Sequence, residues 1–449
     1  MPSAAPRQPR WADTVVLGLA AVLGTGMFIV FAPAAGYAGQ WLPVATVLAV
    51  AAALLSGLSA ARLAGAYSEF GDDRHGVGLV RPWAGRLASV AFLAGRTAAA
   101  AAAGRVFADY VLPSHPRWVA VVVVLAAGAA NLAGVRPTLR GARVLVPALV
   151  GVLVVVVVIG STRRVPPDWS MSALAGGLPP GPADPRLAAV IVPDPTAQPP
   201  VTALGVLTAA GLMYFAFAGF PRTAGRAGPG SRRMLPATAL LALLGYLTLG
   251  QALVHALGLD QLAGDIAPLA TAVGGADAPA LGVLVRVGAA AATVTALVAL
   301  FAGGTATVGA LAGRRELPGW LSPPGQVGVR RRAGLPVIVV SAVLAAVADP
   351  VLTLTATACC ALLYDALLHV AALRRPGEDG RRVWATVSAG TGLVLCLVLL
   401  VLLPTATLLV TLAVVLAGWA VTTVLPLRPV SLPPPGTAGL GTPRVGDGG

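Results

Sequence analysis

Residues 18–30 read GLAAVLGTGMFIV and lie in the middle of an apolar run that covers residues 13–36. A run of roughly 17–25 apolar residues, folded as an α-helix, is long enough to cross a hydrocarbon core of about 30 Å. Gly24 and Gly26, on either side of Thr25, weaken the helix near the middle of that span. Unwinding there would free backbone N–H and C=O groups to bind a solute, whereas close packing of helices on small residues is the structural alternative.

Apolar runs of the same kind recur along the whole chain. The composition agrees, because 57% of the 449 residues are hydrophobic and 11% are charged, whereas a soluble domain carries about 25% charged residues. The runs are continuous and do not alternate with a period of two, so helices are favoured over a transmembrane barrel. We expect an all-α polytopic membrane protein with about twelve transmembrane helices. The expected spans are residues 13–36, 42–66, 87–112, 117–134, 143–161, 201–220, 235–257, 280–312, 333–348, 351–373, 384–403 and 405–425.

The basic residues of the chain set its expected orientation. The formal net charge is +14, but the arginines lie in short loops between apolar runs, which is the positive-inside pattern rather than a nucleic-acid-binding face. With both termini in the cytoplasm, the outer segments hold only Arg117, Arg163, Arg164 and Arg186. We expect a multi-pass protein of the cell membrane with a cytoplasmic N-terminal segment, 1–12, and a disordered cytoplasmic tail, 426–449. The lipid bilayer is its expected partner, and nucleic acid is not.

A second interruption is predicted in the sixth span. Residues 214–220 read YFAFAGF and are followed by Pro221, so aromatic side chains gather beside a Gly and a Pro that break the helix. The first and sixth spans open two five-helix halves, and interruptions at matching positions of two halves indicate a transporter binding site. The candidate binding residues are Gly24, Thr25, Gly26, Phe215, Phe217, Ala218 and Gly219.

Three charged residues are candidates for gating or proton-linked roles. Arg96 and Asp365 lie at similar depths from the inner ends of their helices, roughly 13–15 Å at 1.5 Å per residue. A buried charge is costly without a partner, so the two form a candidate ion pair that opens or takes up a proton. The alternative is that each meets water or the interface separately. Glu69 lies at the cytoplasmic end of the second span and is a candidate for an inner gate or a structural ion pair.

Five segments in order resemble the amino acid–polyamine–organocation permease superfamily. GLAAVLGTGMFIV is similar to its first-helix signature, AGAYSEF at 64–70 to the end of its helix 2, and NLAGVRPTLRGARV at 131–144 to its helix 4–5 join. YFAFAGF is similar to its helix 6, and ALAGRRELPGWL at 310–321 to the loop after helix 8. The matches spread over nearly the whole chain.

The resemblance implies the leucine-transporter-type fold, with two inverted five-helix repeats, 13–161 and 201–373, and two C-terminal helices, 384–425. It implies secondary transport of amino acids or related amines by alternating access. It also implies that the substrate carboxylate meets the backbone near Thr25, while the substrate side chain meets Phe215, Phe217 and Ala218.

The chain departs from the family pattern in ways that affect coupling. Pro221 stands where relatives usually carry a Glu, and the chain has no Lys to serve the Lys-based proton coupling of some relatives. A sodium site would need oxygen atoms from helices 1 and 8, and Thr305 and Thr307 are weak candidates for it. The coupling ion, proton or sodium, stays open.

The function expected from the sequence is a permease for amino acids, with a neutral substrate favoured because the site region is apolar. A cationic amino acid or polyamine exchanger is one alternative, and a degenerate permease acting as a sensor or accessory subunit is another. No nucleotide-binding loop or catalytic constellation is evident, so we expect no enzyme activity, no cofactor and no resident metal.

Overall fold

A computed structural model gives the fold and describes residues 11–63, 82–136, 138–162, 202–226, 234–274, 279–321, 326–374 and 382–424. All regular elements within these ranges are helical, and no strand is present there. Glu69, the AGAYSEF segment and the tail 426–449 lie outside the described residues, as does most of the segment between the fifth and sixth predicted spans.

The helices follow the order of the predicted spans, and some of the spans are divided into shorter helices. Their bounds are α1 (Trp11–Val22), α2 (Gly26–Ile29), α3 (Phe31–Ala38), η1 (Gly39–Trp41), α4 (Leu42–Arg62), α6 (Pro82–Val111), α7 (Pro116–Ala133), α8 (Leu139–Thr162), α11 (Ala203–Phe217), α12 (Phe220–Arg226), α13 (Leu235–Gly264), α14 (Pro268–Val273), α15 (Pro279–Gly313), η4 (Gly319–Leu321), α16 (Gln326–Val347), α17 (Pro350–Arg374), α18 (Arg382–Val401) and α19 (Thr405–Val424).

Among the described residues, nine helical stretches are long and apolar enough to cross a membrane. Two shorter apolar helical stretches, Val15–Ile29 and Ala203–Phe217, coincide with the predicted interrupted spans. The prediction of an all-helical polytopic membrane protein is thereby confirmed. The count of twelve spans and the repeat arrangement stay predictions.

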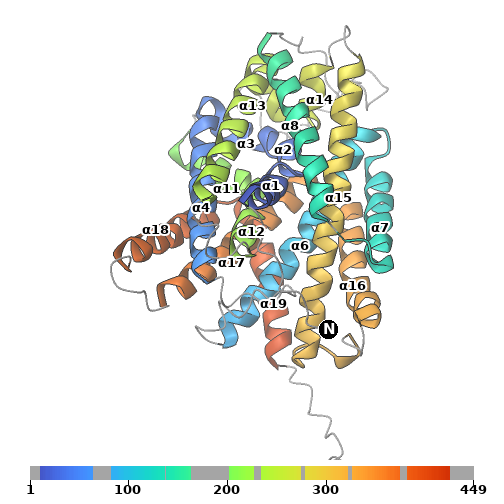
Figure 1. Cartoon of the computed structure of the whole chain (residues 1–449), viewed down its shortest axis with the longest axis vertical. Coiled ribbons are helices and arrows are strands. Elements are labelled where there is room, and N and C mark those ends of the chain that lie inside the picture. Colours follow the sequence, from blue (N-terminus) through green and yellow to red (C-terminus); the bar gives the residue numbers. More distant parts are fainter. Residues whose placement is uncertain are drawn as a thin grey trace, which may run out of the picture.

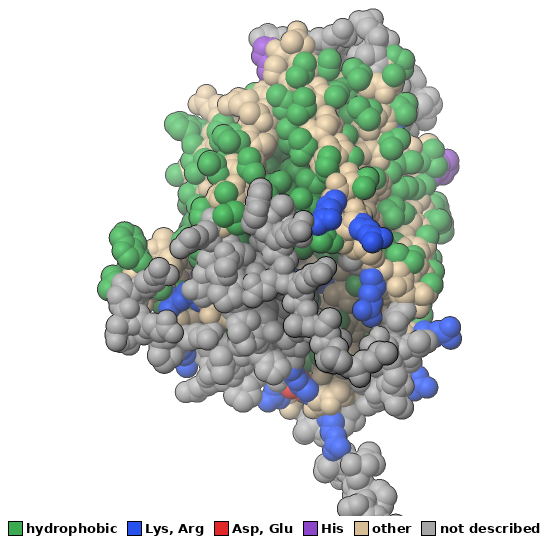
Figure 2. Space-filling model, in the orientation of Figure 1, with side chains coloured by type: hydrophobic (Ala, Val, Ile, Leu, Met, Phe, Trp, Pro, Cys, Tyr) green, Lys and Arg blue, Asp and Glu red, His purple; other side chains and the backbone are tan. Residues whose placement is uncertain are grey.

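Large apolar side chains cover the outside of the bundle. Val144 on α8 is 73% exposed, and Val122, Val287 and Val343 on three other helices are more than half exposed. Figure 2 shows such side chains over the upper half of one face, with basic side chains at mid-height and below. Exposed apolar surface of this extent is what a hydrocarbon solvent requires.

The long helices α6 and α15 pack extensively against each other. The pair α7 and α16 lies beside them, while α4 packs against α11 and α12 (Figure 1). On the other side of the interrupted helices, α13 packs against α3 and α8. The interrupted helices are therefore held between α4 and α13.

Two features of α13 and α14 differ from the predicted spans. The seventh span was expected to end at residue 257, and Gly258 there has a φ of +75°, a value that only glycine adopts without strain. Helical turns continue beyond this kink to Gly264. The short helix α14 was not expected, because six residues are too few for a clear periodic signal.

Candidate functional site

The first membrane helix is interrupted where the sequence predicts it. The helix α1 ends at Val22, Leu23-Gly24-Thr25 is not helical, and α2 begins at Gly26. A Cβ atom on Gly26 would lie 2.5 Å from the Cα atom of Ala216 in α11. Glycine at this position therefore allows the backbones of α2 and α11 to approach closely.

The sixth membrane helix is interrupted in the same manner. The helix α11 ends at Phe217, and α12 begins at Phe220 after Ala218 and Gly219. A Cβ atom on Gly219 would lie 3.3 Å from the Cβ atom of Ala21 in α1. A glycine at each interruption thus packs against the second-last residue of the helix that precedes the other interruption.

Tyrosine hydroxyl groups bind the carbonyl oxygens on both sides of the first interruption. Tyr246 on α13 donates a 2.8 Å hydrogen bond to the Val22 carbonyl oxygen. Tyr110 on α6 donates a 3.1 Å hydrogen bond to the Phe28 carbonyl oxygen and accepts one from the Leu269 N–H group. These bonds satisfy backbone acceptors that the interrupted helix leaves open, which stabilises the interruption.

Aromatic rings surround these tyrosines. The ring of Tyr246 lies 5.6 Å from that of Phe31 and 4.9 Å from that of Phe217, and the ring of Phe28 lies 5.2 Å from that of Tyr110. Of this group, only Phe217 was predicted to belong to the site. The tyrosines were missed because they lie in other helices, far away along the chain, and nothing in their local sequence marks them.

The predicted binding residues of the first interruption are almost entirely enclosed. Thr25 is 7% exposed, and its hydroxyl group has no hydrogen-bond partner among the described residues. On the sixth helix, Phe215 is buried at the end of α11 beside Ala218. The structure thus brings the predicted binding residues of both helices into one region with a free hydroxyl group.

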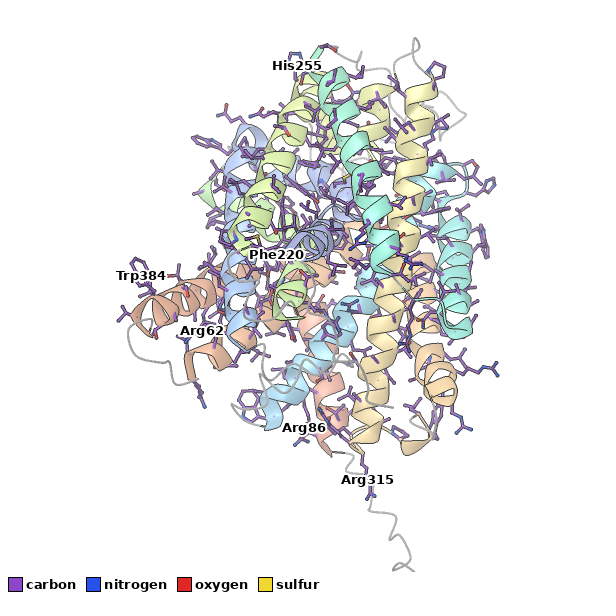
Figure 3. The ribbon with its side chains drawn as sticks, viewed as in Figure 1. Arg62, Arg86, Phe220, His255, Arg315 and Trp384 are labelled. Atoms are coloured by element: carbon purple, nitrogen blue, oxygen red, sulfur yellow. The ribbon has the colours of Figure 1, made fainter. Side chains whose placement is uncertain are left out.

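Phe220, at the start of α12, lies near the middle of the bundle (Figure 3). Its ring would lie 2.9 Å from a Cβ atom on Gly57 of α4, and it also approaches Gly18 of α1. The side chain therefore fills the space between α1 and α4 below the interruptions.

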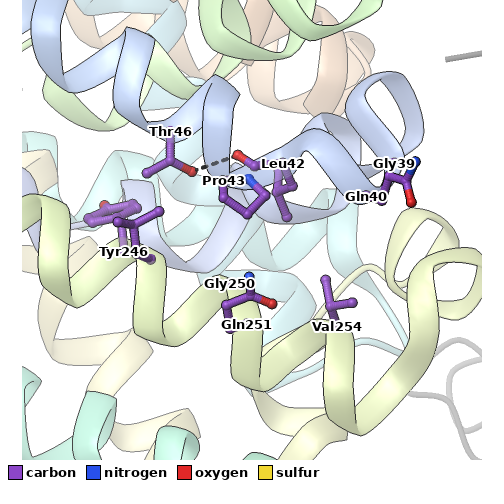
Figure 4. A pocket seen from close by; sticks show the side chains of 10 residues that line it. Gly39, Gln40, Leu42, Pro43, Thr46, Tyr246, Gly250, Gln251 and Val254 are labelled. Atoms are coloured by element: carbon purple, nitrogen blue, oxygen red, sulfur yellow. Dashed lines mark hydrogen bonds between the residues drawn. The ribbon is translucent and has the colours of Figure 1, made fainter.

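A recess between α4 and α13 reaches Tyr246 (Figure 4). It lies between the start of α4 and the middle of α13, where Thr46 and Gly250 line it with the exposed Gln40 and Gln251. Tyr246 therefore takes part both in the lining of the recess and in the hydrogen bond to Val22.

The structure gives Arg96 and Asp365 different partners. Arg96 on α6 donates a 3.2 Å hydrogen bond to the Ala299 carbonyl oxygen and lies over the ring of Phe92. Asp365 on α17 is 2% exposed and accepts a short hydrogen bond from the hydroxyl group of Tyr214. No ion pair joins the two residues in the described structure, so Asp365 pairs with the sixth helix instead of the third.

The two sodium candidates lie on α15 and have protein partners. The Thr305 hydroxyl group accepts a 3.2 Å hydrogen bond from the side-chain amide of Asn131 on α7. The Thr307 hydroxyl group donates to the Gly303 carbonyl oxygen one turn earlier on the same helix. Gly334 of α16 also lies close to Thr305, so this side chain points towards α7 and α16.

Comparison with known proteins identifies relatives over most of the chain. It is 34% identical to an uncharacterised transporter of Mycobacterium tuberculosis and to one of Mycobacterium bovis, over 402 residues that make up 87% of this chain and 85% of theirs. The chain belongs to this transporter family. No protein-family model matches it. The names of these relatives identify transporters and specify no solute.

Proposed function

We propose that this transporter is a secondary transporter for neutral amino acids, working by alternating access. The substrate would be held at the interruptions of the first and sixth membrane helices, and the chain would move it without chemical change. The observation that carries the proposal is the reciprocal packing of these interruptions, Gly26 against Ala216 and Gly219 against Ala21.

That packing is what two related halves would produce. When the two halves, residues 13–161 and 201–373, are superimposed in order of their helices, the start of α2 corresponds to the start of α12. The end of α1 likewise corresponds to the end of α11. The Gly26–Ala216 contact then falls within one residue of the Ala21–Gly219 contact. Because each half has an odd number of spans, the second half would be inverted in the membrane, as in transporters that bind substrate at broken helices.

Packing between the longer helices supports the same correspondence. The contact of α3 with α13 has its counterpart in that of α12 with α4, and the contact of α6 with α17 in that of α15 with α8. Likewise α6 packs on α7 as α15 packs on α16. These pairs favour the leucine-transporter-type arrangement, with α18 and α19 outside the ten-helix core.

The chemistry of the region favours a neutral substrate. Non-helical peptide groups at Leu23–Thr25 and the free Thr25 hydroxyl group offer hydrogen bonds to an amino group and a carboxylate. The rings of Phe28, Phe215 and Phe217 offer apolar surface to a side chain. Asp365, the acid that a cationic side chain would need on the sixth-helix side, already accepts from Tyr214.

We place the protein in the cell membrane with both termini in the cytoplasm. Arg62, Arg86 and Arg315 lie towards one end of the bundle, and His255 lies at the opposite end (Figure 3). A cytoplasmic location for the arginine-rich end accords with the positive-inside rule.

An uptake screen tests the proposal. Purified protein in liposomes would be given labelled leucine, with unlabelled leucine, arginine or putrescine as competitors, under imposed proton and sodium gradients. We expect leucine uptake that unlabelled leucine inhibits more strongly than the two cations do. Inhibition by arginine or putrescine at lower concentrations than leucine would overturn the neutral assignment. Binding without flux, measured as thermal stabilisation by leucine, would indicate a sensor.

A further inference from the structure

A chain of buried polar side chains begins one turn before the sixth-helix interruption. The Tyr214 hydroxyl group on α11 donates to Asp365 Oδ2 and lies 3.4 Å from the Ser56 hydroxyl group on α4. Tyr214 and Ser56 are completely buried, and Asp365 nearly so. Three helices therefore meet at a carboxyl group in the interior of the bundle.

The chain continues towards the arginine-rich ends of α4 and α17. Ser56 Oγ lies 3.2 Å from His369 Nε2, and His369 Nδ1 lies 2.9 Å from Ser59 Oγ. His369 follows Asp365 by one helical turn, and Ser59 follows Ser56 by nearly one turn. The polar side chains of α4 and α17 are therefore spaced at similar intervals along the two helices.

Gly392 of α18 holds the imidazole ring of His369 in place. A Cβ atom on Gly392 would overlap the Cε1 atom of that ring and lie 2.6 Å from Nε2. The backbone of α18 therefore covers the ring directly, and a larger residue at position 392 would displace it. This close fit orients both ring nitrogens towards the serines of α4.

Two arginines also lie near this cluster, because Arg96 of α6 and Arg222 of α12 both lie over the ring of Phe92, which packs on Tyr364, the residue before Asp365. From α18, the Cys396 thiol lies 3.8 Å from Ser56 Oγ. From α6, Gly95 faces Cys360 and Phe92 packs on Tyr364, while Val415 of α19 joins the apolar cluster around Cys360. The titratable groups of the cluster are thus Asp365, His369, Tyr214 and Cys396.

An isolated ionisable group inside a membrane protein is costly and indicates a functional site, with proton relays as one established use. We propose that Asp365 binds the proton that drives transport, and that His369, Ser56 and Tyr214 conduct it there from the cytoplasmic side. This assignment rests on the proposed function, because it supplies the coupling ion for that transporter.

The transfer balances along the chain of hydrogen bonds. Before it, His369 carries its hydrogen on Nε2, Ser56 donates to the Tyr214 oxygen, and Tyr214 donates to Asp365. A proton that water delivers to Ser59 displaces that hydroxyl's own proton onto Nδ1. The Nε2 proton then passes to Ser56, the Ser56 proton to Tyr214, and the Tyr214 proton to Oδ2. Asp365 gains one proton, and every other group ends with the number it had.

A cluster of buried apolar residues lies at the proposed cytoplasmic end of this route. Ala60, Leu63, Ala88 and Ala372 belong to a buried cluster between α4, α6 and α17. Beside it, Arg62 donates a 2.6 Å hydrogen bond to the Ala385 carbonyl oxygen and ties α4 to α18. Ser59 is completely buried, so we expect water to reach it only when these helices separate, which would link proton entry to an inward-facing conformation.

Protonation of Asp365 acts on the substrate site through Tyr214. An ionised carboxylate binds a phenol O–H about twice as strongly as a neutral acceptor does. Uptake of a proton therefore weakens the bond that fixes the last turn of α11, four residues before Ala218. The sixth-helix interruption is then free to change its geometry.

Infrared difference spectra of the purified protein between acid and alkaline pH test the proton site without any substrate. We expect a carboxylic acid C=O band that disappears in Asp365→Asn and persists in Asp349→Asn, which removes an exposed carboxylate just before α17. Tyr214→Phe keeps the acid and removes its donor, so the band should shift and its titration midpoint should rise. The proposal would be overturned if Asp365→Asn and Tyr214→Phe both gave spectra identical to that of the wild type.

A flux measurement tests the route. In liposomes with an imposed proton gradient, Asp365→Asn should lose gradient-driven leucine accumulation and keep leucine exchange, whereas His255→Gln, outside the cluster, should behave as wild type. Gly392→Ala should slow the gradient-driven flux at least about tenfold, which corresponds to about 1.4 kcal/mol. Full accumulation by Asp365→Asn would contradict the assignment. If wild type transports no leucine, the proposed function fails, while the infrared spectra still decide whether Asp365 binds a proton.

Discussion

The Tyr246 hydroxyl group on α13 lies 2.8 Å from the carbonyl oxygen of Val22, the last residue of α1. A side chain from the second half of the chain therefore completes the hydrogen bonding of the first interrupted helix. The relationship makes the interruption a property of the whole bundle, because the local sequence supplies the glycines and a distant helix supplies the donor.

Replacing Tyr246 with Phe should destabilise the protein by about 1–3 kcal/mol, because a buried carbonyl oxygen loses its partner while the ring contacts remain. Thermal unfolding in detergent measures the effect, and leucine uptake should fall with it. Tyr37→Phe is the control, since Tyr37 is 42% exposed. Equal melting temperatures for the two variants would show that the Tyr246 bond does not support the interruption.

Replacing Gly26 with Ala should abolish a close contact that the fold requires. The added methyl group would meet both Cα and Cβ of Ala216, and overpacking of this kind costs about 1–3 kcal/mol. Gly24→Ala is a matched control two residues away, where the nearest atom is the Ala20 carbonyl oxygen at 3.4 Å. We expect a clear loss of thermal stability for Gly26→Ala alone. A similar loss in both variants would mean that helix propensity, rather than the approach of α2 to α11, limits this segment.

Asp265, between α13 and α14, should make stability depend on pH. Burial raises its pKa above the ordinary value of 3.8, and hydrogen bonds from Ala267 and Thr271 offset part of that rise. The folded chain therefore keeps a proton over the interval in which the unfolded chain has already released it. The free energy of unfolding consequently falls as the pH rises from 3.8 through the raised pKa of Asp265.

Asp265→Asn keeps the acceptor for the Ala267 N–H group and cannot ionise. Its melting temperature relative to wild type should therefore increase from pH 4 to pH 8, as measured by thermal unfolding at a series of pH values. Asp260→Asn, which changes an exposed carboxylate five residues earlier, should follow the wild-type curve. An Asp265→Asn curve parallel to wild type would contradict the burial effect.

Thr305→Val should lower stability by about 1 kcal/mol, because the Asn131 amide loses its acceptor. Since Thr305 points towards α7 and α16, the same variant should leave the response of leucine uptake to a sodium gradient unchanged. Uptake at several sodium concentrations measures this, with Thr295→Val on an exposed face of α15 as control. A sodium response that disappears only in Thr305→Val would restore this residue as an ion ligand.

Sequence patterns predicted the parts of the fold that depend on local composition. Apolar runs located the helices because hydrocarbon admits few alternatives, and Gly24, Gly26 and Gly219 located the interruptions because glycine weakens a helix wherever it lies. The short helix α14 and the kink at Gly258 depend on packing above the long helices, and no periodic signal encodes them.

The same patterns could not predict which side chains contact one another. Depth along a helix suggested Arg96 for Asp365, but partners also depend on rotation about the helix axis and on how the helices cross. Those are fixed by packing of residues far apart in the chain, and they turn Arg96 towards α15 and Asp365 towards Tyr214. Tyr110 and Tyr246 were missed for the same reason.

The contact between Gly392 and the His369 ring also has a consequence for the surrounding lipid. In Figure 1, α18 runs aslant of the long axis of the bundle, and its outward side chains, Val394 among them, meet the hydrocarbon. Helices respond to bilayer thickness by changing their tilt. A thicker bilayer that reduces the tilt of α18 would move its backbone relative to the imidazole ring of His369. The length of the lipid acyl chains would therefore affect a histidine that is itself completely buried.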